Sequence, residues 1–271
     1  MKHNLLTTMK LLVGTAIAIA VGLLLVPVMG TTVVPGMMSG WQMAVVIAAA
    51  IAIGTLLWFA ILKFAKGYTL AFFAAAIALL WSDLARAIWK DVLTIIGVFL
   101  VMYAGYYLCV QVMQESWVQT RRWMWLSNYF VVGAIAIAGA SFANRLAPWM
   151  AIVLLGVVAV YDAIAVWKTK HMQAFAKLFM AQKIIPGLGI PKEKEDSWAL
   201  LGGGDIFFIV LTAGTFVKTS IGAVWISAAC MFAALVVLFA ISRKKRFYPA
   251  IPFIFAGQVV ALLLLLCGVG I

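Results

Sequence analysis

The sequence has very few charged residues for its length. Only 10% of its 271 residues are Asp, Glu, Lys or Arg, whereas about a quarter are charged in an average globular protein. Hydrophobic residues make up 66% of the chain, and its mean hydropathy is +1.14. Polar side chains this scarce cannot cover a surface that faces water, which excludes a soluble domain and predicts an integral membrane protein.

Residues that bind metals or form disulfides are also scarce. The two histidines, His3 and His171, are far apart in the sequence and have no further ligands beside them. The three cysteines, Cys109, Cys230 and Cys267, lie singly within apolar stretches. These spacings exclude a disulfide framework and the usual zinc-hydrolase motifs, so we expect a protein without metal or cofactor.

Acidic residues are outnumbered by basic ones, 8 to 20, which gives a net charge of +12. In a soluble chain this balance would suggest nucleic-acid binding. Here Lys and Arg fall between apolar runs that are long enough to cross a bilayer, which takes about 20 residues, so they indicate topology instead. Nine runs are expected to be membrane-spanning helices: Leu11–Met29, Trp41–Leu62, Tyr68–Trp81 with an extension through Asp83 and Arg86 toward Trp89, Val92–Val112, Trp125–Ala143, Ala147–Trp167, Leu200–Val217, Ser220–Ile241 and Ala250–Gly270.

The distribution of the basic residues favours one orientation in the membrane. With a cytoplasmic N-terminus, sixteen of the 20 Lys and Arg residues lie on the cytoplasmic side of the nine spans. We therefore predict an all-α, multi-pass membrane protein with its N-terminus inside and its C-terminus outside. The connection 168–199 is expected to be a cytoplasmic loop between a six-helix part, residues 1–167, and a three-helix part, residues 200–271.

Two of the eight carboxylates lie inside predicted spans. Asp162 lies six residues before Lys168, near the end of the sixth span, and Asp205 lies near the start of the seventh. An ionisable side chain in a membrane costs roughly 3 kcal/mol or more unless it faces protein or water, so such residues are functional candidates. Because the two spans run antiparallel, both carboxylates reach a similar depth on the same side, where they can share one proton.

Two carboxyls that share a proton are suited to peptide hydrolysis. One takes a proton from water, while the other polarises the scissile carbonyl and later protonates the amine. Gly202, Gly203 and Gly204 directly precede Asp205, and without Cβ atoms they let another backbone approach closely. Tight helix packing is the alternative interpretation of such glycines. Beside a buried Asp, we favour function.

A third feature is the sequence Pro249-Ala250-Ile251-Pro252, which opens the ninth span. Prolines keep the start of a helix irregular and leave backbone carbonyls available to a partner strand. Proline is also common at an ordinary helix start, so this motif gains its weight from the other two.

Together these residues resemble the presenilin and signal-peptide-peptidase family of intramembrane aspartyl proteases. The family's motifs are Tyr-Asp, Gly-x-Gly-Asp and Pro-Ala-Leu, and this chain has Tyr161-Asp162, Gly202-Gly203-Gly204-Asp205 and Pro249-Ala250-Ile251 in the same order and spans. Ile251 stands where the family has Leu. The predicted orientation is that of the presenilin branch, and the style of the composition points to a microbial, archaeal-type homologue.

The resemblance implies a presenilin-like fold and an aspartic endopeptidase that cleaves transmembrane helices of protein substrates within the bilayer. By the same resemblance, Asp162 and Asp205 would be catalytic, while Tyr161, the three glycines and Pro249, Ala250 and Ile251 would support the site or the substrate. It implies membrane-protein substrates and lipid as partners, with no nucleic acid; homo-oligomerisation stays open. Two alternatives remain from the residues themselves: a proton- or cation-coupled transporter that uses the same carboxylates, and a structural subunit whose aspartates tie helices together.

Overall fold

The structure is a computed structural model of the chain. It describes residues 5–29, 68–89, 91–169, 181–192, 198–242 and 248–268, together with six isolated positions, 42, 45, 49, 53, 178 and 179. The expected second span, Trp41–Leu62, lies almost entirely outside the described residues. So does the basic sequence 243–246 that contributes to the predicted orientation.

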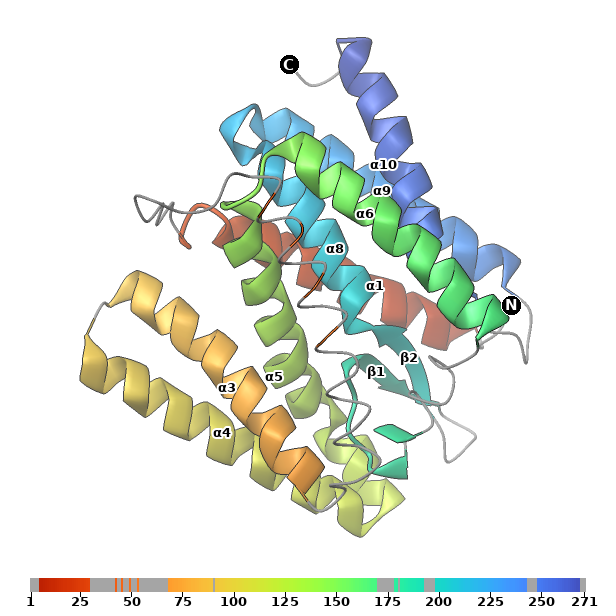
Figure 1. The fold of residues 1–271 in the computed structure, drawn as a ribbon. Coiled ribbons are helices and arrows are strands. Elements are labelled where there is room, and N and C mark those ends of the chain that lie inside the picture. Colours follow the sequence, from red (N-terminus) through yellow and green to blue (C-terminus); the bar gives the residue numbers. More distant parts are fainter. Residues whose placement is uncertain are drawn as a thin grey trace.

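The described chain is mostly helical (Figure 1). Its elements follow one another in this order: α1 (Leu5–Leu25), α3 (Thr69–Ile88), α4 (Val92–Glu115), α5 (Trp117–Ala143), α6 (Pro148–Ala163), the π-helical turn η2 (Ile164–Lys168), β1 (Gly187–Pro191), β2 (Trp198–Gly202), α8 (Gly203–Gly214), the 3-10 turn η3 (Thr215–Lys218), α9 (Ile221–Ile241) and α10 (Ile251–Leu266).

Six of the described helices are long and apolar enough to cross a membrane, namely α1, α3, α4, α5, α6 with its extension η2, and α9. The protein is therefore a multi-pass integral membrane protein. As the sequence indicates, α3 continues through Asp83 and Arg86 to Ile88. Two further apolar helices are shorter, α8 with 12 residues and α10 with 16. The total of nine spans and the orientation stay predictions.

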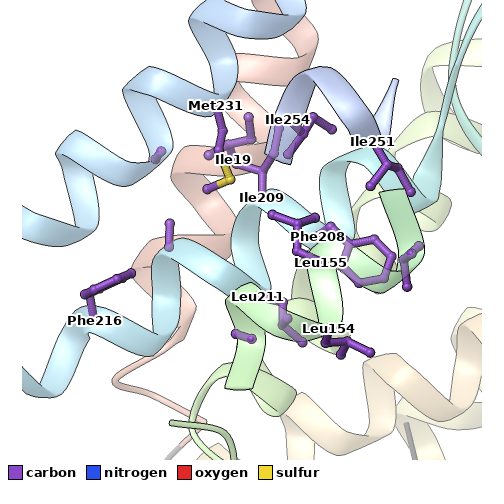
Figure 2. Close-up of a cluster of buried hydrophobic side chains, with 14 of the residues drawn as sticks. Ile19, Leu154, Leu155, Phe208, Ile209, Leu211, Phe216, Met231, Ile251 and Ile254 are labelled. Atoms are coloured by element: carbon purple, nitrogen blue, oxygen red, sulfur yellow. The ribbon is translucent and has the colours of Figure 1, made fainter. Parts of the chain in front are cut away.

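Helix α8 lies at the centre of the bundle, in contact with α1, α5, α6, α9 and α10 (Figure 1). Its residues from Ile206 to Gly214 are buried apart from half-buried Phe207. Figure 2 shows part of the hydrophobic cluster around it, to which α1, α6, α9 and α10 contribute together with α8 and η3: Ile19, Leu154, Leu155, Phe208, Ile209, Leu211, Phe216, Met231, Ile251 and Ile254. Close packing of this kind holds membrane helices together, because lipid offers little hydrophobic driving force between them. This packing holds the part of α8 that begins at Ile206.

The segment expected to be a loop contains a buried antiparallel β-hairpin, which corrects the all-α expectation. Strands β1 and β2 pair from Gly187 opposite Gly202 to Pro191 opposite Trp198. Leu188, Ile190, Ala199 and Leu201 are buried, and β1 contacts both α1 and α5. The expected span Leu200–Val217 accordingly begins later, because the chain is a strand as far as Gly202 and becomes helical at Gly203.

The reason for the hairpin is the need to pair backbone groups away from water. An unpaired N–H or C=O costs several kcal/mol in a bilayer, so non-helical backbone is tolerated there only inside protein or around a cavity. Strand pairing satisfies the inward-facing groups of the five residues on each strand, and the groups of alternate residues point out of the hairpin. Leu188 and Ile190 also alternate with Gly187 and Gly189, which is the two-residue period of a strand, although the run is short.

The N-terminus of α4 generates a prediction about pH. The Asp91 carboxylate accepts hydrogen bonds from the hydroxyl and the backbone N–H of Thr94, at 2.6 and 2.8 Å. Both bonds favour the ionised form and lower the pKa of Asp91 below 3.8, and the hydroxyl has the larger effect. The folded chain therefore holds this proton less tightly than the unfolded chain, so the stabilisation is complete above pH 3.8 and is lost as the pH falls through the lower, folded pKa. Asp91→Ala should lower the melting temperature in detergent at neutral pH, and the deficit should shrink in acid. A deficit independent of pH would contradict this capping role, and Asp91→Asn, which keeps an oxygen acceptor, is the control.

Candidate active site

Asp205 lies in the first turn of α8, directly after the hairpin. Gly202 is the N-cap residue of this helix, so Asp205 is its third helical residue. From that position its carboxylate reaches back to the backbone N–H of Gly202, as acidic side chains do in a capping box. The first N–H groups of a helix have no partner within it and carry the positive end of its dipole. Asp205 is half-buried, and the helix N-terminus beside it favours a negatively charged carboxylate at this position.

Asp162 lies at the other side of the site, next to the last residue of α6. The helix does not end there but continues as the π-helical turn η2, a form that is often found at functional sites. Asp162 Oδ2 accepts a hydrogen bond of 3.2 Å from the backbone N–H of Ile251, which opens α10. The backbone N–H of Ala250 also lies within hydrogen-bonding reach of this carboxylate. A second helix N-terminus thus faces the second carboxylate.

The structure brings the two carboxylates together. Helices α6 and α8 pack against each other, and the side chains of Asp162 and Asp205 are close enough to interact electrostatically. Both are half-buried, at positions where each has a helix N-terminus beside it. Two like charges this close favour a state in which one proton is shared by the pair.

The three glycines before Asp205 differ in their surroundings. The N–H of Gly203 donates to the Pro186 carbonyl at 2.9 Å, and a Cβ on Gly203 would also lie 2.9 Å from that oxygen and clash with Ile135. A Cβ on Gly202 would lie 3.2 Å from the Asp205 carboxylate. At Gly204, by contrast, a Cβ would have nothing within 4 Å. Gly203 therefore serves backbone packing, Gly202 leaves room for the carboxylate, and Gly204 borders open space.

The remaining residues expected at the site also lie near it. Pro249 is buried and Ala250 is the N-cap residue of α10. Ile251 is buried in the same hydrophobic cluster as Phe208 of α8, so a β-branched side chain packs well at this position (Figure 2). The tyrosine before Asp162, Tyr161, is 42% exposed and lies close enough to Asp162 to interact with it electrostatically.

Sequence analysis missed a polar residue behind the hairpin. Asn128 of α5 is buried and bonds through its amide to both backbone groups of Gly189 in β1. Its signal was visible, because a polar amide inside an apolar span usually faces protein. The role of Gly187 was missed as well. A Cβ at this position would clash with the Leu201 carbonyl across the hairpin, so the strand pair requires glycine there. Within the described residues, no three His, Cys, Asp or Glu side chains form a group that could hold a metal ion.

Comparison with known proteins gives a fold. No family model matches the chain, and no curated protein matches it. Two solved structures of a presenilin family intramembrane aspartate protease, in the C222 and P2 space groups, match with TM-scores of 0.63 and 0.64. Their sequences are 18% and 19% identical to this one, and the matches cover 95% and 94% of this chain and 96% and 95% of theirs. The chain therefore has the fold of these proteases over almost its whole length.

The difference between the glycines can be tested by single substitutions. Gly203→Ala should lower the free energy of unfolding by about 1–3 kcal/mol, because the new methyl group meets a backbone oxygen that cannot move aside easily. Gly204→Ala should leave the protein as stable as the wild type or more so, since alanine favours a helix and its Cβ meets nothing. Thermal unfolding in detergent measures both. Equal losses at the two positions would show that steric fit does not distinguish them.

Proposed function

We propose that this protein is an intramembrane aspartic endopeptidase that hydrolyses peptide bonds within the transmembrane helices of other membrane proteins. The observation that carries the proposal is that two carboxylates, Asp162 and Asp205, interact at the ends of two packed helices of a multi-pass membrane protein. Each has backbone N–H donors beside it, from the start of α10 and of α8. The fold shared with presenilin family intramembrane aspartate proteases supports the same function.

The pair can carry out hydrolysis without a metal or a nucleophilic side chain. The ionised carboxylate takes a proton from a water molecule as its oxygen bonds to the scissile carbonyl carbon, and the protonated carboxyl donates its proton to the carbonyl oxygen. The tetrahedral diol then collapses: the C–N bond breaks, the nitrogen receives a proton from the dyad, and a new carboxyl and a new amine leave. The Ile251 N–H fixes the direction of the Asp162 carboxyl throughout.

Amide substitutions at the dyad test this function. Asp162→Asn and Asp205→Asn should each abolish cleavage of a labelled transmembrane peptide, because the amide keeps the shape of the side chain but cannot share a proton. The wild-type rate should rise and then fall with pH, since one carboxyl must be ionised and the other protonated. Product formation is measured by mass spectrometry on protein purified in detergent, with folding checked by thermal unfolding.

Two results would count against the protease. Wild-type rates in either variant would refute the role of the dyad. Proton or cation flux in reconstituted vesicles that disappears in both variants, with no cleavage by the wild type, would favour a coupled transporter.

The substrate must be extended at the cleavage site, because a helix hides its carbonyls in internal hydrogen bonds. We infer that β2 receives the extended segment. In an antiparallel strand pair, two opposite residues either hydrogen-bond to each other through their backbones or both point their backbone N–H and C=O groups away from the partner strand. Gly189 points its N–H and C=O toward Asn128 and away from β2, so its partner Leu200 points its own outward from the hairpin. The outward groups of Leu200 lie five residues before Asp205 in the chain.

Proline at position 200 tests this edge. Leu200→Pro removes an N–H that the hairpin does not use, so the strand pair should survive, as proline is tolerated at outward-facing edge positions. Cleavage should fall by up to about tenfold, the value of one net hydrogen bond. Leu200→Ala is the matched control, because it loses the side chain and keeps the N–H. Equal kcat/KM values for the two variants would contradict pairing at this residue.

A further inference from the structure

The side chain of Asn128 substitutes for a neighbouring strand. Its Nδ2 donates to the Gly189 carbonyl at 2.7 Å, and its Oδ1 accepts from the Gly189 N–H at 2.9 Å. The amide is 5% exposed and lies in the middle of α5, far from either end of that helix. An Asn amide offers one donor face and one acceptor, as a peptide group does, so it closes the outer edge of β1 at this residue.

The bonded strand residue is a glycine, which permits the close approach. A Cβ on Gly189 would lie 2.8 Å from Ile185 Cδ1 and 3.5 Å from Met124 Sδ, which is on the same helix as Asn128. On its other side β1 contacts α1, where a Cβ on Gly14 would lie 2.9 Å from Leu188 Cδ2. The hairpin is therefore held between two helices by packing, and its position along α5 is set by two directional hydrogen bonds.

A continuous series of backbone contacts leads from Gly189 to the candidate catalytic residue. Gly187 lies two residues before Gly189 and pairs with Gly202, the N-cap residue of α8. The next residue, Gly203, donates its N–H to the Pro186 carbonyl. Asp205 follows two residues later in the same helical turn. Strand pairing, one backbone hydrogen bond and the first turn of α8 thus connect the hairpin to Asp205, so a displacement of the hairpin is passed on to this residue.

We propose that Asn128 is a positioning residue that sets the depth of Asp205 against Asp162, and with it the peptide bond that is cut. The proposal rests on the protease function proposed above. Sliding the hairpin along α5 by one residue would move Gly202 by about 3.3 Å, the rise of a strand. Asp162 would not follow, because it is held from α6 and from the N-terminus of α10. Loss of the two Asn128–Gly189 hydrogen bonds therefore changes the position of Asp205 relative to Asp162 and the point along a substrate at which cleavage occurs.

Asn144, the C-cap residue of the same helix, is a matched control. It is buried, and its Nδ2 donates to the Val26 carbonyl at 2.6 Å, which ties α5 to the segment after α1. Its position sixteen residues further along α5 places it at the end of that helix away from Gly189. Asn128→Ala and Asn144→Ala thus each remove a buried side-chain amide that donates a hydrogen bond to a backbone carbonyl of another segment. Of the two, Asn128 is the one that bonds the hairpin.

The experiment compares the two variants with the wild type on one transmembrane peptide. Asn128→Ala should lower kcat by about 10²-fold or more, because a misplacement of about 1 Å already has that effect and a one-residue slide moves Gly202 further, while KM should be much less affected. Its products should include bonds that the wild type does not cut, identified by mass spectrometry. Hydrogen exchange of the Gly189 amide should accelerate. Asn144→Ala should keep the wild-type products and a slow Gly189 amide. Asn128→Leu, of similar volume and suited to lipid, replaces the alanine variant if that variant does not fold.

The outcomes separate the inference from the function on which it rests. Unchanged products and kcat in the folded Asn128 variant, beside an active wild type, would overturn the positioning role and leave the protease intact. Equal effects of Asn128→Ala and Asn144→Ala would reduce Asn128 to a stabilising residue and also overturn it. A folded wild type that cuts no transmembrane peptide would overturn the proposed function and the inference together.

Discussion

A carboxylate within a membrane protein must find its hydrogen-bond donors in the protein itself, and the architecture around this site follows from that requirement. The first N–H groups of a helix are unused within the helix and can serve. Asp205 uses those at the start of its own helix, while Asp162 uses the N–H of Ile251 at the start of α10. Two helix N-termini must therefore converge on one point, which fixes α6, α8 and α10 relative to one another.

The same requirement explains why a hairpin precedes α8. For a helix to begin inside the bundle, the chain before it must be non-helical and yet have its backbone groups paired. Pairing of β2 with β1 does this, and the hydrogen bond from Gly203 to Pro186 extends it to the first helical residue. Glycine is needed at 187 and 203 because backbone atoms approach there too closely for a Cβ. The glycines that the sequence presents as one cluster thus have separate tasks.

How far the sequence predicts the site depends on how each feature is encoded. Asp162 and Asp205 could be found because a charge within an apolar run is rare and conspicuous. The hairpin could not, since five-residue strands rich in glycine give little periodic signal and resemble a loop. The N–H of Ile251 could not either, because every residue except proline has one and only the fold decides which carboxylate it meets. The burial of the Asn128 amide could be predicted from its apolar surroundings, but its bonding partner, the backbone of a strand, could not.

The hairpin also has two unlike edges, and this asymmetry restricts where an extended peptide could pair with it. Asn128 occupies the outward groups of β1 at Gly189, so an extended peptide that paired there would have to displace a buried amide and leave it without partners, at a cost of about 1–3 kcal/mol. Leu200 on β2 carries the corresponding outward groups, and it lies in the strand that leads directly to Asp205. Pairing at β2 incurs no such loss. In the proposed protease, Asn128 would thereby also direct an incoming substrate strand to the edge nearest Asp205.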